Sequence, residues 1–167
     1  YLRKTRGIAA NSDGILITSG TVNAFHLYLH HVLHKDDTVI DGKPGYTTFN
    51  KILDTINVNT VEITVDEDGL RLDQIEKICQ ERNVAMVYAI PHHHHPTTVK
   101  LSAERRMKLM QLSEKYNFKI VEDDYDYDFH YDSSPVLPLA SYKQHENVVY
   151  VGSFSKLLMP SIRIGFL

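Results

Sequence analysis

The chain has 167 residues, with 18 lysines and arginines against 21 aspartates and glutamates, for a formal net charge of −3. Its 43% hydrophobic and 23% charged content is typical of a soluble globular domain and excludes disordered, collagen-like and disulfide-scaffold chains. No run approaches the roughly 18 apolar residues of a membrane span, and a pI near 6.4 argues against nucleic-acid binding by this segment. The single Cys79 cannot form an internal disulfide, as is typical of a cytoplasmic protein.

The spacing of apolar residues switches between strand-like and helix-like along the chain. Apolar and β-branched runs predict strands at residues 15–18, 38–40, 60–65, 84–90, 118–121 and 148–151. Helices are predicted from 21 to about 34, from after Pro44-Gly45 to near 56, around Ile75 to about 83, and after the N-cap Ser102 through 117. The last residues, 162–167, have the pattern of an unfinished strand and the chain begins without Met, so we expect a fragment or the ordered part of a longer protein.

Alternation of strands with helices of this length predicts one three-layer α/β/α domain with a mostly parallel sheet. In such sheets, ligands bind beyond the carboxyl ends of the strands. This rule selects four loops for the candidate site, at residues 19–21, 91–98, 122–125 and 153–156. The loops are far apart in sequence, and we expect them to converge.

These loops carry the residue types that pyridoxal 5′-phosphate needs from a protein. Lys156 follows a strand close to Ser153, and a lysine amine forms a Schiff base with the cofactor aldehyde. Asp123 ends the preceding strand, where a carboxylate can pair with the pyridinium nitrogen. Residues 19–21 open a helix, and the N-terminus of a helix binds phosphate.

The same segments resemble a known family. Residues 151–156, followed by 160–165, are similar to the lysine segment of fold-type-I aminotransferases. Residues 122–126, continuing to Phe129, Tyr131 and Pro135, resemble the aminotransferase-like domain of MocR/GabR-type transcription regulators of the GntR group. Residues 16–21 and 44–46 match the same pattern, so the resemblance covers the whole chain.

The resemblance implies a role for each matched residue, and none of these roles comes from spacing alone. Lys156 is the expected Schiff-base lysine and, in transamination, the proton shuttle. Asp123 is the expected partner of the pyridine nitrogen. The other implied cofactor contacts are Tyr125 with the ring oxygen, Tyr46 stacked on the ring, His94 where the family has an amide, and Ser19, Gly20, Thr21, Ser153 and Arg163 around the phosphate. Thr98 departs from the family pattern, which has glycine there.

We interpret the chain as the central part of the large domain of a cytoplasmic MocR-type regulator that binds a small amine or amino acid. The N-terminal winged helix, which would contact DNA, and the C-terminal small domain lie outside this segment. A homodimer is implied by the resemblance only, and no membrane contact is expected. A free-standing aminotransferase, which passes an amino group from an amino acid to a 2-oxo acid, is the alternative.

The histidines suggest a third interpretation, a metal-binding or purely structural domain. His26, His30 and His34 recur at helical spacing, and His92 to His95 form a run. However, no carboxylate or cysteine is spaced to complete a zinc site. We therefore predict no metal, and we interpret the helical histidines as a polar flank beside the core and Cys79 as a small core residue.

Overall fold

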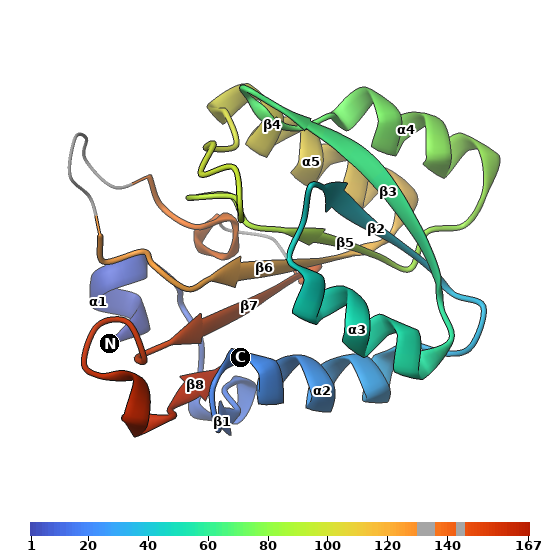
Figure 1. Cartoon of the computed structure of the whole chain (residues 1–167). Coiled ribbons are helices and arrows are strands. Elements are labelled where there is room, and N and C mark those ends of the chain that lie inside the picture. Colours follow the sequence, from blue (N-terminus) through green and yellow to red (C-terminus); the bar gives the residue numbers. More distant parts are fainter. Residues whose placement is uncertain (130–135, 143–145) are drawn as a thin grey trace.

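The computed structural model describes residues 1–129, 136–142 and 146–167, which leaves Tyr131 and Pro135 outside the described residues. Within this part of the chain, an eight-stranded sheet has the order β1-β8-β7-β6-β5-β2-β3-β4 (Figure 1). The strands are β1 Ile17–Thr18, β2 Thr38–Lys43, β3 Asn59–Asp66, β4 Gly69–Leu70, β5 Met86–Ala89, β6 Lys119–Asp124, β7 Val148–Ser153 and β8 Gly165–Phe166. The central pairs β3/β2, β2/β5, β5/β6 and β6/β7 are parallel, as predicted.

Helices cover both faces of this sheet, so the predicted three-layer architecture is confirmed (Figure 1). The helices are α1 Leu2–Arg6, α2 Thr21–Val32, α3 Thr47–Ile56, α4 Leu72–Glu81 and α5 Ala103–Tyr116. Helices α2 and α3 pack together on one face, and α4 and α5 pack on the other. Short 3₁₀ turns are η1 Ser12–Gly14, η2 Leu139–Ser141 and η3 Pro160–Ile162.

Among the described residues, two large apolar cores lie between these layers, and a third, smaller cluster around Tyr150 and Phe166 packs beside α1. Phe25 and Phe49 pack with strand residues on the α2/α3 face, and Ile75 and Leu109 pack on the α4/α5 face. Side chains alternate between the two faces of a strand. In β6, for example, Ile120 joins the α4/α5 core and Val121 the α2/α3 core. The three acidic residues that follow continue this alternation.

Local chemistry explains where several elements begin and end. The Ser102 hydroxyl accepts a hydrogen bond from the Arg105 N–H at 3.4 Å, which confirms the predicted N-cap of α5. Asn117 ends the same helix in the left-handed conformation that asparagine tolerates. The predicted strand at 84–90 is shortened to β5, and the helix predicted to about 34 ends at Val32.

The sequence pattern did not predict several peripheral elements. Helix α1 is too short for a periodic signal, and β4 is a two-residue strand that pairs antiparallel with β3 across the turn at 66–69. The segment 162–167 is only partly a strand, because η3 ends at Ile162 and β8 covers two residues. Strand β8 is antiparallel to both β1 and β7, so β1 runs in the same direction as β7. Among the described residues, no helix is long and apolar enough to cross a membrane.

Candidate cofactor site

A cavity of about 300 Å³ opens at the carboxyl ends of the central strands. This volume is at the lower end of the range of small-molecule sites. The lining residues are Thr21, Val22, Tyr46, Ile90, His95, Asp123, Tyr125, Ser153, Ser155, Lys156 and Arg163. The four loops that the parallel-sheet rule selected therefore converge here, joined by Tyr46 after β2 and Arg163 before β8.

The buried wall of the cavity carries the carboxyl group of Asp123, which is 3% exposed. Its Oδ2 accepts a hydrogen bond from the Tyr88 hydroxyl at 2.6 Å, whereas its Oδ1 is buried with no hydrogen-bond partner among the described residues. Burial raises the pKa of Asp123 to about 7; the Tyr88 bond opposes this shift, and the neighbouring charges of Asp124 and Asp126 add to it. The free Oδ1 is therefore an acceptor that suits a cationic N–H donor.

Donors for an anion gather around β1, β7 and β8. Ser153, Ser155, Lys156 and Arg163 line this part of the cavity, and the Ser155 Oγ is buried without a partner among the described residues. Arg163 Nη2 lies 3.4 Å from the Ser19 carbonyl oxygen, to which it donates. Arginine, hydroxyls and the start of α2 together form a setting that favours phosphate.

Two observations favour glycine at the start of α2, and the backbone conformation is the stronger one. Gly20 has a φ of +87°, and a Cβ added there would lie 2.7 Å from Arg163 Nη2. Gly20 thus allows the guanidinium group to approach the first turn of the helix. Ser19 and Gly20, both predicted phosphate contacts, are not among the residues that line the cavity, whereas Thr21 is.

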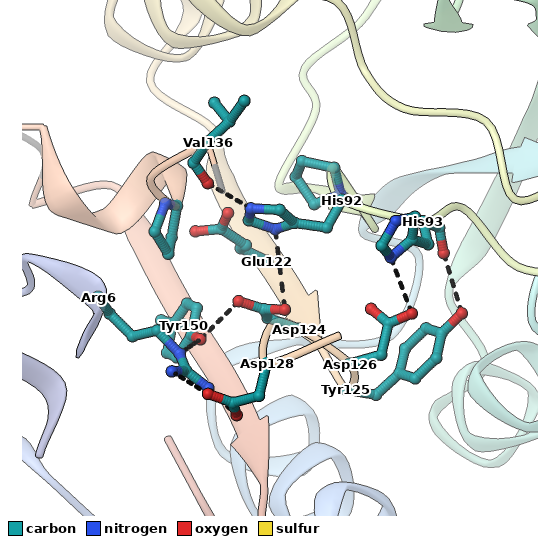
Figure 2. A network of polar contacts seen from close by, with 12 residues as sticks. Arg6, His92, His93, Glu122, Asp124, Tyr125, Asp126, Asp128, Val136 and Tyr150 are labelled. Carbon is teal, nitrogen blue, oxygen red and sulfur yellow. Dashed lines mark hydrogen bonds and ion pairs between the residues drawn. The ribbon is translucent and has the colours of Figure 1, made fainter. Parts of the chain in front are cut away.

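Aromatic side chains line the part of the cavity near the ends of β2, β5 and β6. Tyr46 precedes α3, and its ring meets the His95 ring edge-to-face with centroids 5.6 Å apart. The Tyr125 hydroxyl donates to the His93 carbonyl oxygen at 3.0 Å (Figure 2). Burial, followed by the charges of Asp126, Asp123 and Asp124, raises the pKa of Tyr125 to about 12, so its phenol stays neutral near pH 7.

His94 does not line this cavity, although the resemblance implied that it contacts the cofactor. Its Nε2 lies 2.8 Å from the Pro44 carbonyl oxygen, and the residue is 4% exposed. Burial lowers the pKa of His94. His95, the next residue of this irregular loop, lines the cavity instead.

Five further residues of the site were absent from the predicted contacts: Val22, Tyr88, Ile90, His95 and Ser155. Ser155 belongs to the lysine motif, so its closeness to Ser153 was the one signal in the sequence. Tyr88 meets Asp123 only because Tyr88 pairs in register with Val121 of β6. No periodicity within a single segment reveals such a contact between strands.

The other histidines form no metal cluster of three or more ligands within the described residues. The rings of His26 and His30 stack at 5.7 Å on the exposed side of α2, and the Thr55 hydroxyl lies 3.2 Å from His30 Nε2. His93 Nδ1 lies 2.9 Å from Asp126 Oδ2, and His92 Nε2 lies 2.5 Å from the Val136 carbonyl oxygen (Figure 2). The His93 contact holds the loop at 91–98 against the segment that follows β6, and the His92 contact holds it against residue Val136.

The family model described as aminotransferase class I and II matches residues 1–167. The chain belongs to this family. The HTH-type transcriptional regulator TauR of Rhodobacter capsulatus is 34% identical to this aminotransferase-family chain over 167 residues, which is 100% of the chain and 34% of TauR. The aromatic-amino-acid aminotransferase 1 of Thermococcus litoralis is 30% identical over 172 residues, covering 100% of the chain and 41% of that relative.

Among solved structures, the kynurenine aminotransferase of Pyrococcus horikoshii in complex with PMP matches with a TM-score of 0.93 and 30% identity. The match covers 99% of this aminotransferase-family chain and 42% of the solved chain. The chain thus spans between 34% and 42% of the length of these three proteins. Both regulators and enzymes are relatives, as the sequence motifs predicted.

Pyridoxal 5′-phosphate, the cofactor predicted from the sequence, is supported by the family and by its solved structures. The residues of the cavity fit this group. An unpartnered carboxylate oxygen suits its ring nitrogen, and an arginine with two serines suits its phosphate. Lys156 lines the same cavity and offers the amine.

Proposed function

We propose that this chain is the pyridoxal phosphate-binding large domain of a cytoplasmic MocR-type regulator of the GntR group, and that it binds a small amine or amino acid through Lys156. The main support for this proposal is the arrangement of hydrogen-bond acceptors and donors in the cavity. Asp123 offers a free oxygen on the buried wall, while Arg163, Ser153 and Ser155 offer donors around β7 and β8. The 34% identity to the regulator TauR supports the regulatory role.

When bound, pyridoxal phosphate supplies an aldehyde that reacts with amines and a ring that withdraws electrons. Lys156 Nζ would hold the cofactor and, once a ligand amine has replaced it, could move a proton at the ligand Cα. Asp123 Oδ1 would keep a proton on the ring nitrogen. Arg163, Ser153 and the backbone of Gly20 and Thr21 would fix the phosphate.

Borohydride trapping tests this assignment directly. The full-length protein is incubated with pyridoxal phosphate, reduced, and mapped by peptide mass spectrometry. We expect an adduct at Lys156 that Lys156→Ala abolishes and that Lys77→Ala, which changes an exposed lysine of α4, leaves intact. No adduct in the full-length protein would contradict the proposal.

A genuine aminotransferase is the second candidate. It is favoured by the TM-score of 0.93 to the Pyrococcus horikoshii kynurenine aminotransferase, at 30% identity. Multiple turnovers of an amino donor with a 2-oxo acid would support the enzyme. A stoichiometric half-reaction, together with a ligand-dependent change in DNA affinity, would support the regulator.

The partners follow from the regulator proposal. DNA would be contacted by a helix-turn-helix domain outside residues 1–167, and the protein would act as a homodimer. Sedimentation analysis of the full-length protein tests the dimer. Binding to DNA from its own promoter region, with and without candidate amines, tests the regulatory role.

A further inference from the structure

The two oxygens of the Asp123 carboxylate have different environments. Oδ2 accepts the Tyr88 hydroxyl at 2.6 Å, and Oδ1 has no partner among the described residues. Asp123 also belongs to the lining of the cavity, whereas Tyr88 does not. Tyr88 therefore touches the site only through this carboxylate.

The Tyr88 hydroxyl is held in place from three directions. Its ring stacks on Phe49 of α3 with centroids 3.8 Å apart and planes 11° apart, and it meets Phe25 of α2 edge-to-face at 5.8 Å. Its backbone lies in β5 beside Val121 of β6. The side chain is 1% exposed. Burial, followed by the negative charge of Asp123, raises its pKa well above the ordinary value, so the phenol remains a neutral donor.

We propose that Tyr88 is the positioning residue of the site, which binds one oxygen of Asp123 so that a single oxygen faces the ligand. This inference rests on the proposed function and sharpens it. One free oxygen matches the single N–H of a pyridinium ring. A guanidinium group, which donates two parallel hydrogen bonds to both oxygens of a carboxylate, finds one of them already occupied.

Tyr88 also favours the charged form of Asp123. A donated hydrogen bond stabilises a carboxylate, so its removal raises the pKa of Asp123 further above its ordinary value. The protonated acid then attracts a pyridinium nitrogen less strongly near pH 7. The ionisable groups near this carboxyl are Asp124 and Asp126 on its own segment, Tyr88 from β5, and Tyr46, His95, Tyr125, Lys156 and Arg163 around the cavity.

The chain contains a matched control for this contact. Tyr150 of β7 donates to Asp124 Oδ2, also at 2.6 Å and also buried. Asp124 is the next residue of β6 and points to the opposite face of the sheet, away from the cavity. Tyr88→Phe and Tyr150→Phe therefore remove the same chemical contact on the two sides of one strand.

The experiment measures the affinity of the full-length protein for pyridoxamine 5′-phosphate. This compound lacks the aldehyde, so it cannot form a covalent Schiff base with Lys156. We expect Tyr88→Phe to bind about tenfold more weakly at pH 7, since a hydrogen bond to a charged group is lost. The deficit should shrink as the pH rises from 6.5 to 8.5, because the Asp123 carboxyl ionises again. Tyr150→Phe should retain the wild-type affinity at each pH.

Equal affinity and pH dependence in Tyr88→Phe and wild type would overturn the inference, as would an equal loss in Tyr150→Phe. Failure of the proposed function is distinguishable, because the wild type itself would then give no adduct at Lys156. If Tyr88→Phe does not fold, Phe49→Leu keeps the hydroxyl and removes the stacked ring. We expect that variant to lose about threefold in affinity, and an unchanged affinity would then refute the role.

Discussion

Strand β6 presents buried acidic side chains to both faces of the sheet, and the partners of these side chains differ between the two faces. On the α4/α5 face, Glu122 accepts the backbone N–H groups of Leu139 and Ala140 at 2.8 and 3.0 Å. On the same face, Asp124 accepts the Tyr150 hydroxyl, which in turn accepts a hydrogen bond from Arg6 (Figure 2). Asp124 Oδ1 has no hydrogen-bond partner among the described residues, but it lies 3.7 Å from His92 Nδ1. On the α2/α3 face, Asp123 also has one bonded and one free oxygen, and Asp123 lines the cavity whereas Asp124 does not.

Burial alone therefore does not show which of the three carboxyl groups in this strand binds a ligand. All three carboxyl groups are at most 3% exposed, and burial raises the pKa of each, to about 7 for Glu122 and Asp123 and about 6 for Asp124. What differs is what the carboxyl groups face. Glu122 binds η2, and Asp124 binds Tyr150, which is itself bonded to Arg6 of α1. Only Asp123 of these three lines the cavity, where its Oδ1 is free to bind a ligand.

The largest effect should come from Arg6, which joins α1 to the α4/α5 face. It donates two hydrogen bonds to Asp128, at 2.9 and 2.7 Å, and lies over the Tyr127 ring at 4.0 Å. Arg6→Ala should lower the free energy of unfolding by about 3 kcal/mol, because the buried guanidinium group loses its hydrogen bonds to Asp128 and Tyr150 and its contact with the Tyr127 ring. Urea denaturation checks this value, with the exposed Arg3→Ala as control. A folded Arg6→Ala protein should keep its affinity for the cofactor. A loss of that affinity would contradict the view that the α4/α5 face stabilises the fold without contributing to the cavity.

Glu122→Ala should have the next largest effect. It leaves the N–H groups of Leu139 and Ala140 without their acceptor in a buried place, at a cost of about 2 kcal/mol. Urea denaturation again measures the loss. Glu122→Gln, which keeps one acceptor oxygen, should lose less. Cofactor affinity should stay at the wild-type value in both variants, and a tenfold drop would show that η2 affects the cavity.

The pH dependence of stability sharpens the comparison for Asp123. A carboxyl group whose pKa is higher in the folded state than in the unfolded state binds its proton more tightly when folded. Its contribution to the free energy of unfolding is therefore largest below about pH 4 and falls as the pH rises to about 7. In the cofactor-free protein, Asp123→Asn should flatten this fall and gain about 1 kcal/mol at pH 8. Urea denaturation from pH 5 to 8 checks this, and the exposed Asp13→Asn should leave the slope unchanged.

The sequence predicted the central sheet and the convergence of its loops, because apolar periodicity identifies strands and parallel strands end at one edge. Lys156, Asp123, Tyr125 and Ser153 accordingly line one cavity. His94, to which the resemblance assigned a cofactor contact, does not line this cavity, and its neighbour His95 does. A one-residue difference in an irregular loop leaves no periodic signal in the sequence. Tyr88 was missed because its contact depends on the register between β5 and β6.

The loop at 91–98 joins the two faces, with His92 turned to the acidic network and His95 to the cavity. Thr98 lies in this loop with a φ of +62°, a conformation that a β-branched residue rarely adopts and that glycine adopts freely. Thr98→Gly should raise the free energy of unfolding by about 0.5 kcal/mol, since relief of strain exceeds the added freedom of the unfolded chain. Thermal unfolding measures the gain, and Thr97→Gly, at a position without positive φ, should lose stability instead. If both glycine variants lose stability equally, the conformation of Thr98 carries no strain, and its departure from the family's glycine has no cost to the fold.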